Sequence, residues 1–284
     1  MRPEIIVLGG DGMLGHKVVQ RLRGIGPTIA TVRGKAEAPE TIGGCDLMNF
    51  DHVESLLSKL EPAFVINCAG IVKQRREAVD AIPSITINSL LPHRLAQWCA
   101  RWGGRLIHFS SDCVFSGTRG NYTEEDQSDA TDLYGRTKYL GEVDAPNALT
   151  LRTSMIGREL KRHSGLLDWF LAQNHGCVRG FRRAIYSGVT TNHLAALVEH
   201  IIDSHSRLTG MYQVAAAPIS KYDLLAALSE AYRLDIEIIP DDTEVCDRSM
   251  KGDKLRAAIG YQAPAWRDLI AQLAQDPTPY ERRN

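Results

Sequence analysis

The sequence predicts an α/β protein, with a doubly wound parallel sheet and a smaller α/β portion towards the C-terminus. Three observations predict it. Short apolar runs alternate with amphipathic stretches through the first half of the chain, a glycine-rich loop follows the first run, and the alternation loosens after Arg152. With 284 residues, the chain is long enough for one large domain or for two smaller ones that share a core.

Five apolar runs in the first half have the length and composition of buried strands. They are Ile5–Leu8, Ile29–Val32, Phe64–Asn67, Leu106–Ser110 and Leu149–Leu151. The stretches between them have the apolar periodicity of helices, over Leu14–Leu22, Val53–Leu60 and Ile87–Trp102. This strand–helix order builds a parallel sheet with helices on both faces, which is the Rossmann-type architecture.

The loop after the first strand has glycine at positions 9, 12 and 15, in the pattern G-x-x-G-x-x-G. Glycines at this spacing allow a tight turn and a close approach of the backbone to a pyrophosphate. The helix that follows offers free N–H groups and the positive end of its dipole to the phosphates. The loop therefore predicts dinucleotide binding at the first strand–helix turn.

The second half predicts four helices and two strands. The helices are Leu166–Gln173, Asn192–Ser204, Lys221–Tyr232 (capped by Ser220) and Trp266–Leu273, and the strands are Met211–Val214 and Ile236–Ile239. We therefore expect residues 1–152 to form a dinucleotide-binding domain, which the chain rejoins at about 184–206. Residues 153–183 and 207–284 are expected to form a smaller substrate-binding portion.

The composition excludes several classes of function. A formal net charge of -1 gives no overall field that would attract nucleic acid or an anionic membrane, so neither is an expected partner. No apolar run approaches the ~20 residues that span a bilayer. The six cysteines contain no C-x-x-C pair and the nine histidines show no metal-binding spacing. We therefore expect no disulfide, no metal site and a cytoplasmic location.

The end of the second strand helps to choose the cofactor. An acidic residue there would bind the adenosine ribose hydroxyls of NAD(H), but this sequence has Arg33, followed closely by Lys35. A guanidinium pairs well with the 2′-phosphate of NADP(H). We therefore favour NADP(H), with NAD(H) as the alternative.

Tyr134 and Lys138 have the spacing i and i+4, so they share one face of a helix. We expect the ammonium to lower the pKa of the phenol, which then gives a proton to the alkoxide that forms when hydride reaches a carbonyl. Ser111 follows the strand that ends at Ser110, at the edge where doubly wound folds bind ligands, and can orient that carbonyl. Together these residues indicate carbonyl reduction more specifically than any one of them.

At these motifs the sequence resembles the extended short-chain dehydrogenase/reductase superfamily. Within it, the chain is most similar to the dTDP-4-dehydrorhamnose reductases and related nucleotide-sugar 4-ketoreductases. The resemblance spans most of the chain. It rests on the glycine loop 9–15, the acidic loop Asp46-Leu47, the strand end 67–70, the helix asparagine Asn88, and the segments 110–115, 134–138, 151–154 and 248–249.

The resemblance implies a role for each matched residue. Ser111, Tyr134 and Lys138 would be catalytic, and Lys138 would also hold the nicotinamide ribose. Contacts with the cofactor would come from Gly9, Gly12, Met13, Leu14, Gly15, Arg33, Asp46, Leu47, Cys68, Ala69, Gly70, Ser110, Tyr134 and Lys138. Contacts with the nucleotide-sugar substrate would come from Ser111, Asp112, Cys113 and Arg248.

The resemblance also implies the reaction, which is NADPH-dependent reduction of a nucleoside-diphosphate-linked 4-keto-6-deoxy sugar. Such enzymes serve the biosynthesis of deoxysugars for surface polysaccharide or glycoconjugates, and a homodimer is the family-level expectation. Cys113 stands where the related dehydratases carry glutamate, and a thiol replaces that acid poorly, so dehydration is disfavoured. Met155-Ile156 departs from the aromatic residues that often follow L-R-T-S, so the sequence does not fix the sugar or the nucleotide.

Two other functions on the same scaffold stay open. One is an NAD-dependent nucleotide-sugar epimerase, and the other is a non-catalytic regulatory subunit like the beta subunit of methionine adenosyltransferase. On the substrate side, a diphosphate needs cations. Candidates in the smaller portion are Lys161, Arg162, His163, Arg179, Arg182, Arg183, Arg248, Lys251 and Lys254.

Overall fold

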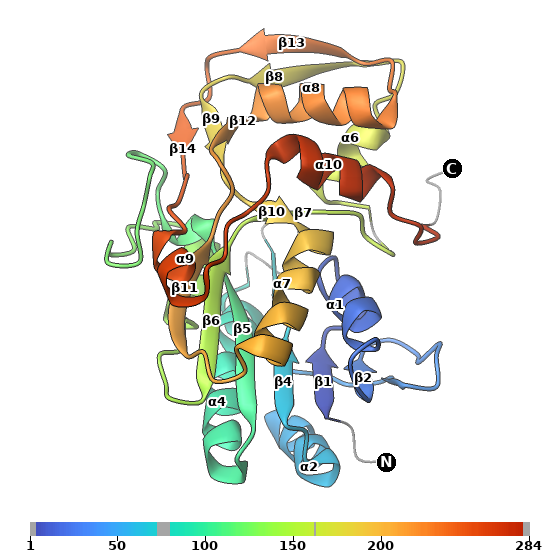
Figure 1. Ribbon diagram of the computed structural model, residues 1–284, viewed down its shortest axis with the longest axis vertical. Coiled ribbons are helices and arrows are strands. Elements are labelled where there is room, and N and C mark those ends of the chain that lie inside the picture. The colour runs from blue at the N-terminus through green and yellow to red at the C-terminus, as the bar shows by residue number, and fades with distance from the viewer. Residues whose placement is uncertain (1–3, 73–79, 162, 281–284) are drawn as a thin grey trace.

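A computed structural model of the chain describes residues 4–72, 80–161 and 163–280. Its centre is a seven-stranded parallel sheet in the order β11-β6-β5-β4-β1-β2-β3 (Figure 1). The strands are β1 (Ile5–Leu8), β2 (Thr28–Thr31), β3 (Thr41–Ile42), β4 (Phe64–Asn67), β5 (Arg105–Ser111), β6 (Ala148–Thr153) and β11 (Gly210–Val214). The predicted fold class is confirmed.

Helices cover both faces of this sheet. On one face, α1 (Gly15–Leu22) packs against α7 (Thr191–Ser204), and their apolar residues share one core with the smaller portion of the chain. On the other face, α2 (Phe50–Leu60) and α4 (Leu91–Trp102) form a second core with the sheet. The two cores are separate because each strand of a doubly wound sheet sends alternate side chains to opposite faces.

The strand order reverses at β1, which pairs with β2 on one side and with β4 on the other. Leu8 is level with Thr31 and with Asn67, so three strands end together at this point. The chain leaves β1 and β4 towards opposite sides of the sheet. A crevice therefore opens at their carboxyl ends, which is where open α/β sheets bind ligands.

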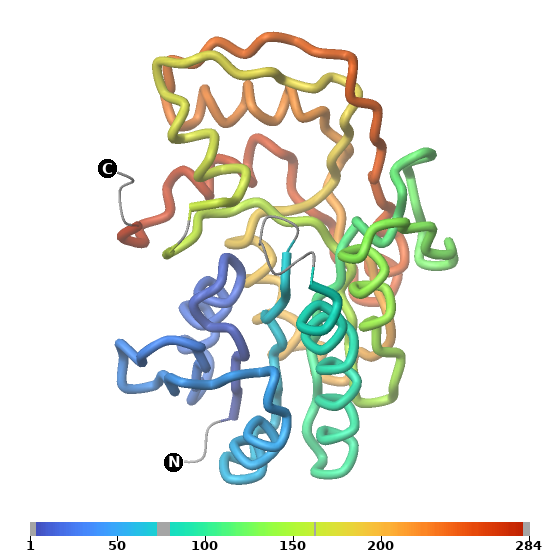
Figure 2. Tube along the Cα trace, turned by 180° about the vertical axis from the view of Figure 1, so that it is seen from behind, coloured from blue at the N-terminus to red at the C-terminus, as the bar shows by residue number. Residues whose placement is uncertain are grey.

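The smaller portion lies beyond the carboxyl ends of the strands, as both views show (Figures 1 and 2). Two short sheets, β13-β8 and β12-β9-β14, pack with helix α8. Helix α10 packs against both α8 and α7. The elements are β8 (Cys177–Phe181), β9 (Ala184–Tyr186), β12 (Ile219–Ser220), β13 (Glu237–Asp241), β14 (Cys246–Asp247), α6 (Leu166–Leu171), α8 (Lys221–Tyr232), α9 (Asp253–Ile259) and α10 (Trp266–Ala274).

The division between the two portions differs from our expectation in two places. Strand β11 belongs to the central sheet, where it pairs with β6 along its whole length, although it falls within the expected substrate portion 207–284. Strand β9, in the segment expected to rejoin the main sheet, pairs with β12 and β14 instead. The chain returns through α7, and a strand that follows a crossover helix adds to the edge of the parent sheet.

Local signals in the smaller portion behave as the sequence predicts. Ser220 caps α8, and its hydroxyl accepts a hydrogen bond from the Asp223 N–H at 3.0 Å.

None of the helices in the described ranges is long and apolar enough to cross a membrane.

Candidate active site

A cleft of about 1100 Å³ lies between the carboxyl ends of the central strands and the smaller portion. All but one of the site residues expected from the sequence line it. They are Gly9, Gly12, Met13, Leu14, Arg33, Asp46, Leu47, Cys68, Ala69, Gly70, Ser110, Ser111, Asp112, Cys113, Tyr134, Lys138 and Arg248. The exception is Gly15, which is buried beneath the loop rather than in the cleft wall.

The glycine loop needs its glycines for different reasons. Gly9 has φ +78°, a conformation that residues with a Cβ adopt only with strain. A Cβ on Gly15 would lie 2.0 Å from the Gly9 carbonyl oxygen, so α1 can start against the loop only with glycine there. Gly15 therefore contributes close packing between the loop and α1.

Two residues just before α1 line the cleft and have backbone N–H groups available for hydrogen bonds. Within the described part of the chain, no acceptor pairs with the backbone N–H of Met13 or Leu14, and both residues line the cleft. Donors of this kind at the first turn of a helix are the usual ligands of a pyrophosphate. Farther along the wall, the exposed side chain of Arg33 and the loop residues Asp46 and Leu47 lie where the adenosine end of a dinucleotide would bind. The site thus fits a dinucleotide cofactor.

Ser111 and Tyr134 come together from two different elements. Ser111 ends β5 and caps the short 3₁₀ helix Asp112–Val114, since its Oγ accepts from the Cys113 N–H at 3.1 Å. Tyr134 lies in the first turn of α5 (Leu133–Leu140), which Asp132 caps through the Gly135 N–H at 2.8 Å. The two hydroxyls are hydrogen-bonded to one another. A carbonyl placed beside them would meet both at once.

Lys138 is buried on the same face of α5, and its ammonium donates to the Phe109 carbonyl at 2.6 Å. Burial lowers the pKa of Lys138 to about 8, although Glu142 opposes that change. For Tyr134, burial raises the pKa, and the hydrogen bond with Ser111 opposes the rise. The expected lowering of the Tyr134 pKa by Lys138 is therefore wrong for this structure. The Lys138 ammonium donates to a backbone carbonyl, and burial has the largest effect on the pKa of the Tyr134 phenol.

The position of α5 is fixed by two close backbone contacts. A Cβ on Gly135 would lie 2.2 Å from the Cys113 carbonyl oxygen, and one on Gly141 would lie 1.8 Å from that of Asn88. The side chain of Asn88 bonds both the N–H and the carbonyl of Ile71, at 2.8 and 2.9 Å. Glycine at both ends of the helix thus lets Tyr134 and Lys138 approach β5 closely.

The side chain of Ser110 has a different role from that of Ser111. Its hydroxyl donates to Glu142 at 2.7 Å, and Glu142 accepts two further bonds of 2.7 Å from the buried guanidinium of Arg152. Both serines line the cleft, but successive side chains of a strand point to opposite faces, so the hydroxyl of Ser110 turns to Glu142 and that of Ser111 lies beside Tyr134.

Sequence reasoning missed many residues of the cleft wall, among them Tyr186 at the end of β9 and Lys221 at the start of α8. The Lys221 ammonium lies 4.5 Å from the centre of the Tyr186 ring. Burial lowers the pKa of Lys221, while Asp112 and Cys113 act in the opposite direction. No carboxylate of the described residues pairs with this ammonium. A helix N-terminus in the sequence gives no sign that its first lysine turns inwards, so only the tertiary structure identifies it.

The basic residues of the smaller portion differ in how they are already engaged. Lys161, Arg179 and Arg182 pair with Glu37, Asp241 and Asp242, respectively. Arg248 is half-buried and lines the cleft, and its Nε–H donates to the Phe115 carbonyl at 2.8 Å. Arg162 lies outside the described residues. Lys221 and Arg248 are therefore the cations best placed for an anionic group of a substrate.

Comparison with known proteins agrees with this geometry. The family model described as RmlD substrate binding domain matches residues 1–278. The dTDP-4-dehydrorhamnose reductase of Mycolicibacterium smegmatis is 25% identical over 244 residues, which cover 84% of this chain and 72% of that protein. The methionine adenosyltransferase 2 subunit beta of Danio rerio is 25% identical over 247 residues, which cover 81% and 74%.

Other curated relatives match over about half of their length or less. The dTDP-4-dehydrorhamnose reductase of Streptomyces griseus is 31% identical over 142 residues, which cover 50% of this chain and 44% of that protein. Among solved structures, the dTDP-4-dehydrorhamnose reductase of Bacillus anthracis in complex with NADP superposes with a TM-score of 0.82. It is 19% identical, with 96% of this chain and 99% of that chain covered, so the likeness supports the fold. The family match spans nearly the whole chain, and the protein therefore belongs to the RmlD substrate-binding-domain family.

Proposed function

We propose that this protein is an NADP(H)-dependent oxidoreductase that reduces the keto group of a nucleoside-diphosphate-linked 4-keto-6-deoxy sugar. The observation that carries the proposal is one shared cavity. Ser111, Tyr134 and Lys138 line the same cleft as the glycine loop, so a cofactor bound at the loop extends towards the three side chains. NAD(H) is the alternative cofactor, and Arg33 at the cleft favours NADP(H).

The three side chains have complementary roles in the proposed reaction. When bound, the cofactor supplies the hydride that reduces the keto carbon. The hydroxyl of Ser111 hydrogen-bonds the keto oxygen and holds it beside Tyr134. Tyr134 stays protonated at neutral pH because burial raises its pKa, and it gives its proton to the oxygen as negative charge develops there. Lys138, whose ammonium is held at the Phe109 carbonyl on the same face of α5, would hold the ribose of the bound cofactor.

The nucleotide sugar is proposed to lie against the smaller portion, which supplies the other wall of the cleft through residues such as Trp169, Tyr186 and Lys221. Lys221 and Arg248 face the diphosphate, while Asp112 and Cys113 lie next to the sugar. Cations desolvated in a cleft bind a diphosphate more strongly than exposed ones, because fewer waters compete for them. Such a substrate is an intermediate in the synthesis of deoxysugars for surface polysaccharide or glycoconjugates.

The experiment that tests this function is a panel of dTDP-, GDP- and UDP-linked 4-keto-6-deoxy sugars, assayed in parallel with NADPH and NADH. We expect consumption of NADPH with at least one sugar of the panel, and slower consumption of NADH. Failure of every sugar with both cofactors would refute the proposed reaction. Turnover of a nucleotide sugar without added cofactor, by a preparation that retains NAD, would instead identify an epimerase.

The likeness to methionine adenosyltransferase 2 subunit beta keeps a second candidate in view, a non-catalytic subunit on the same fold. The serine, tyrosine and lysine of this chain are all present in one cleft, which favours catalysis. A pulldown that recovers a stoichiometric enzyme partner, together with no turnover of keto sugars, would favour the subunit.

The proposal extends to location and assembly. None of the six cysteines is in a disulfide, which suits a reducing compartment such as the cytoplasm. A homodimer follows from the resemblance to the reductases, and light scattering of the purified protein tests it.

A further inference from the structure

The carbonyl of Gly12 fixes the orientation of one peptide in the glycine loop. It accepts two hydrogen bonds from His16, one from the backbone N–H at 3.2 Å and one at the ring Nδ1 at 2.9 Å. A carbonyl only accepts, so Nδ1 carries the proton. In a trans peptide the C=O and the next N–H point in opposite directions. Holding the Gly12 carbonyl against α1 therefore turns the Met13 N–H towards the cleft.

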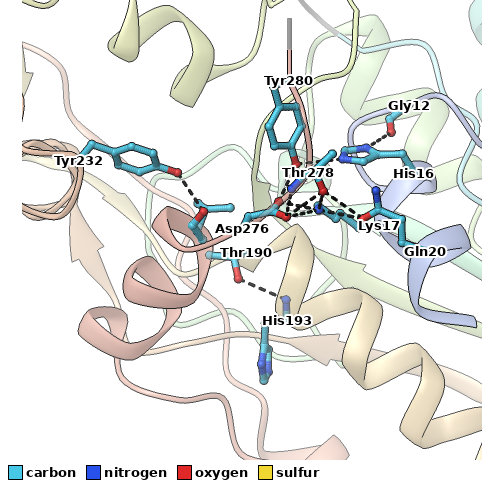
Figure 3. Close-up of polar contacts among 11 residues, drawn as sticks. Gly12, His16, Lys17, Gln20, Thr190, His193, Tyr232, Asp276, Thr278 and Tyr280 are labelled. Atoms are coloured by element: carbon cyan, nitrogen blue, oxygen red, sulfur yellow. Dashed lines mark hydrogen bonds and ion pairs between the residues drawn. The ribbon is translucent and has the colours of Figure 1, made fainter. Parts of the chain in front are cut away.

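His16 is held in turn by a segment far away in the sequence, residues 276–280. Its Nε2 hydrogen-bonds the Tyr280 hydroxyl at 3.1 Å, and the two rings meet edge to face, with centres 5.7 Å apart (Figure 3). Burial lowers the pKa of His16, so the ring is neutral at pH 7 and its Nε2 is an acceptor. The single hydroxyl proton of Tyr280 therefore lies between two acceptors, this Nε2 and a carboxylate oxygen of Asp276 at 2.7 Å. His16 is 3% exposed, so the rotation of its ring is set by contacts within the protein and not by solvent.

A buried ion pair anchors the same segment on α1. The Lys17 ammonium lies 2.5 Å from one oxygen of Asp276 and 2.6 Å from the other, and the two side chains are 5% and 4% exposed (Figure 3). Burial opposes ionisation of Asp276, but hydrogen bonds from Lys17, Tyr280 and Thr278 outweigh it and lower its pKa. The carboxylate is therefore charged at neutral pH. Because these contacts are buried, the segment 276–280 and the start of α1 hold one another in place.

From this chain of contacts we infer that Tyr280 and Asp276 are positioning residues for the cofactor. They act through His16 to keep the Gly12–Met13 peptide turned so that its N–H faces the pyrophosphate. The inference rests on the proposed function, because it takes the glycine loop to be the cofactor site. It adds that affinity for the cofactor depends on a segment more than 260 positions away from the loop, which lies outside the cleft.

The variant Tyr280→Phe tests the inference, because it keeps the ring and removes the hydroxyl that contacts both His16 and Asp276. Tyr232→Phe is the matched control. Tyr232 has similar exposure and lies in the same region, but its hydroxyl donates to the Leu273 carbonyl at 3.2 Å and does not reach His16 (Figure 3). Calorimetry gives the Kd for NADPH, and steady-state kinetics at saturating NADPH give the KM for the sugar.

We expect Tyr280→Phe to weaken NADPH binding about five- to tenfold, as the loss of one hydrogen bond in a preorganised site does. Tyr232→Phe should leave the Kd within about twofold, and neither variant should change the KM for the sugar. In a His16→Phe background, Tyr280→Phe should have no further effect on the Kd, since the link to the loop is already broken.

Three results would overturn the inference. They are an unchanged Kd for NADPH in Tyr280→Phe, an equal loss in Tyr232→Phe, and a parallel rise in the KM for the sugar, which would indicate general loosening of the fold. None of them contradicts the proposed function, which fails only if the wild-type protein does not bind NADPH or does not reduce a keto sugar.

Discussion

Replacing Tyr134 by phenylalanine removes one oxygen atom from the wall of the cleft and leaves the ring in place. In our account that oxygen carries the proton that the keto oxygen receives. Removing a positioned proton donor slows reactions by about 10²–10⁴-fold. This corresponds to about 3–5 kcal/mol on the barrier. We expect a loss of that size in both kcat and kcat/KM.

The same substitution should change the fold very little. It deletes the hydrogen bond between Tyr134 and Ser111, which is worth about 1 kcal/mol, so the expected shift in Tm is about 2 °C for a chain of this size. The Kd for NADPH should stay within about twofold. A Tyr139→Phe variant is the control, because Tyr139 lies on the same helix with 43% of its surface exposed.

The assay follows NADPH consumption with the best sugar of the panel, with Tm and the Kd for NADPH measured on the same preparations. If Tyr134→Phe keeps more than a tenth of the wild-type kcat/KM, Tyr134 is not the proton donor. If the activity falls together with a large drop in Tm, the loss reflects folding, and the assignment loses its support.

Three further predictions concern Lys138, Lys221 and Gly15. Because the pKa of Lys138 is about 8 and that of Tyr134 is raised, Lys138 should set the alkaline limit, so kcat/KM falls as pH rises above about 8; a profile that stays flat to pH 10 would contradict this. Lys221→Met should raise the KM for the nucleotide sugar about tenfold and leave the Kd for NADPH unchanged. A change in the Kd for NADPH alone would show that Lys221 contacts the cofactor and not the sugar. Gly15→Ala puts a Cβ 2.0 Å from the Gly9 carbonyl oxygen, so α1 must shift; the expected result is at least a tenfold weaker Kd for NADPH or loss of soluble protein, and wild-type affinity would refute the role of the packing.

Local signals in the sequence were sufficient to predict most of the central sheet. The runs Ile5–Leu8 and Phe64–Asn67 are strands with the predicted bounds, because buried parallel strands are continuous apolar runs between polar residues. The pair Tyr134 and Lys138 lies on one helix as its spacing predicts, and Ser111 ends a strand beside it. Each of these inferences depends on residues close together in the sequence.

The parts that the sequence did not reveal depend on contacts between distant segments. Strand β11 joins the central sheet through pairing with β6, which no local pattern encodes. Lys221 turns into the cleft because β9 places the Tyr186 ring beside it. The pKa of Tyr134 rises because burial outweighs nearby charge, and burial is a property of the assembled cleft. The contact between segment 276–280 and α1 has the same origin.

The most direct test of the central claim follows the hydride itself. NADPH carrying deuterium at the transferred position is incubated with the protein and a reactive nucleotide-linked 4-keto-6-deoxy sugar, and the product is examined by NMR and mass spectrometry. We predict one deuterium on C4 of the sugar for each NADPH oxidised. A product without deuterium at C4, or one formed without oxidation of NADPH, would contradict the claim that this cleft transfers hydride from the cofactor to the keto carbon.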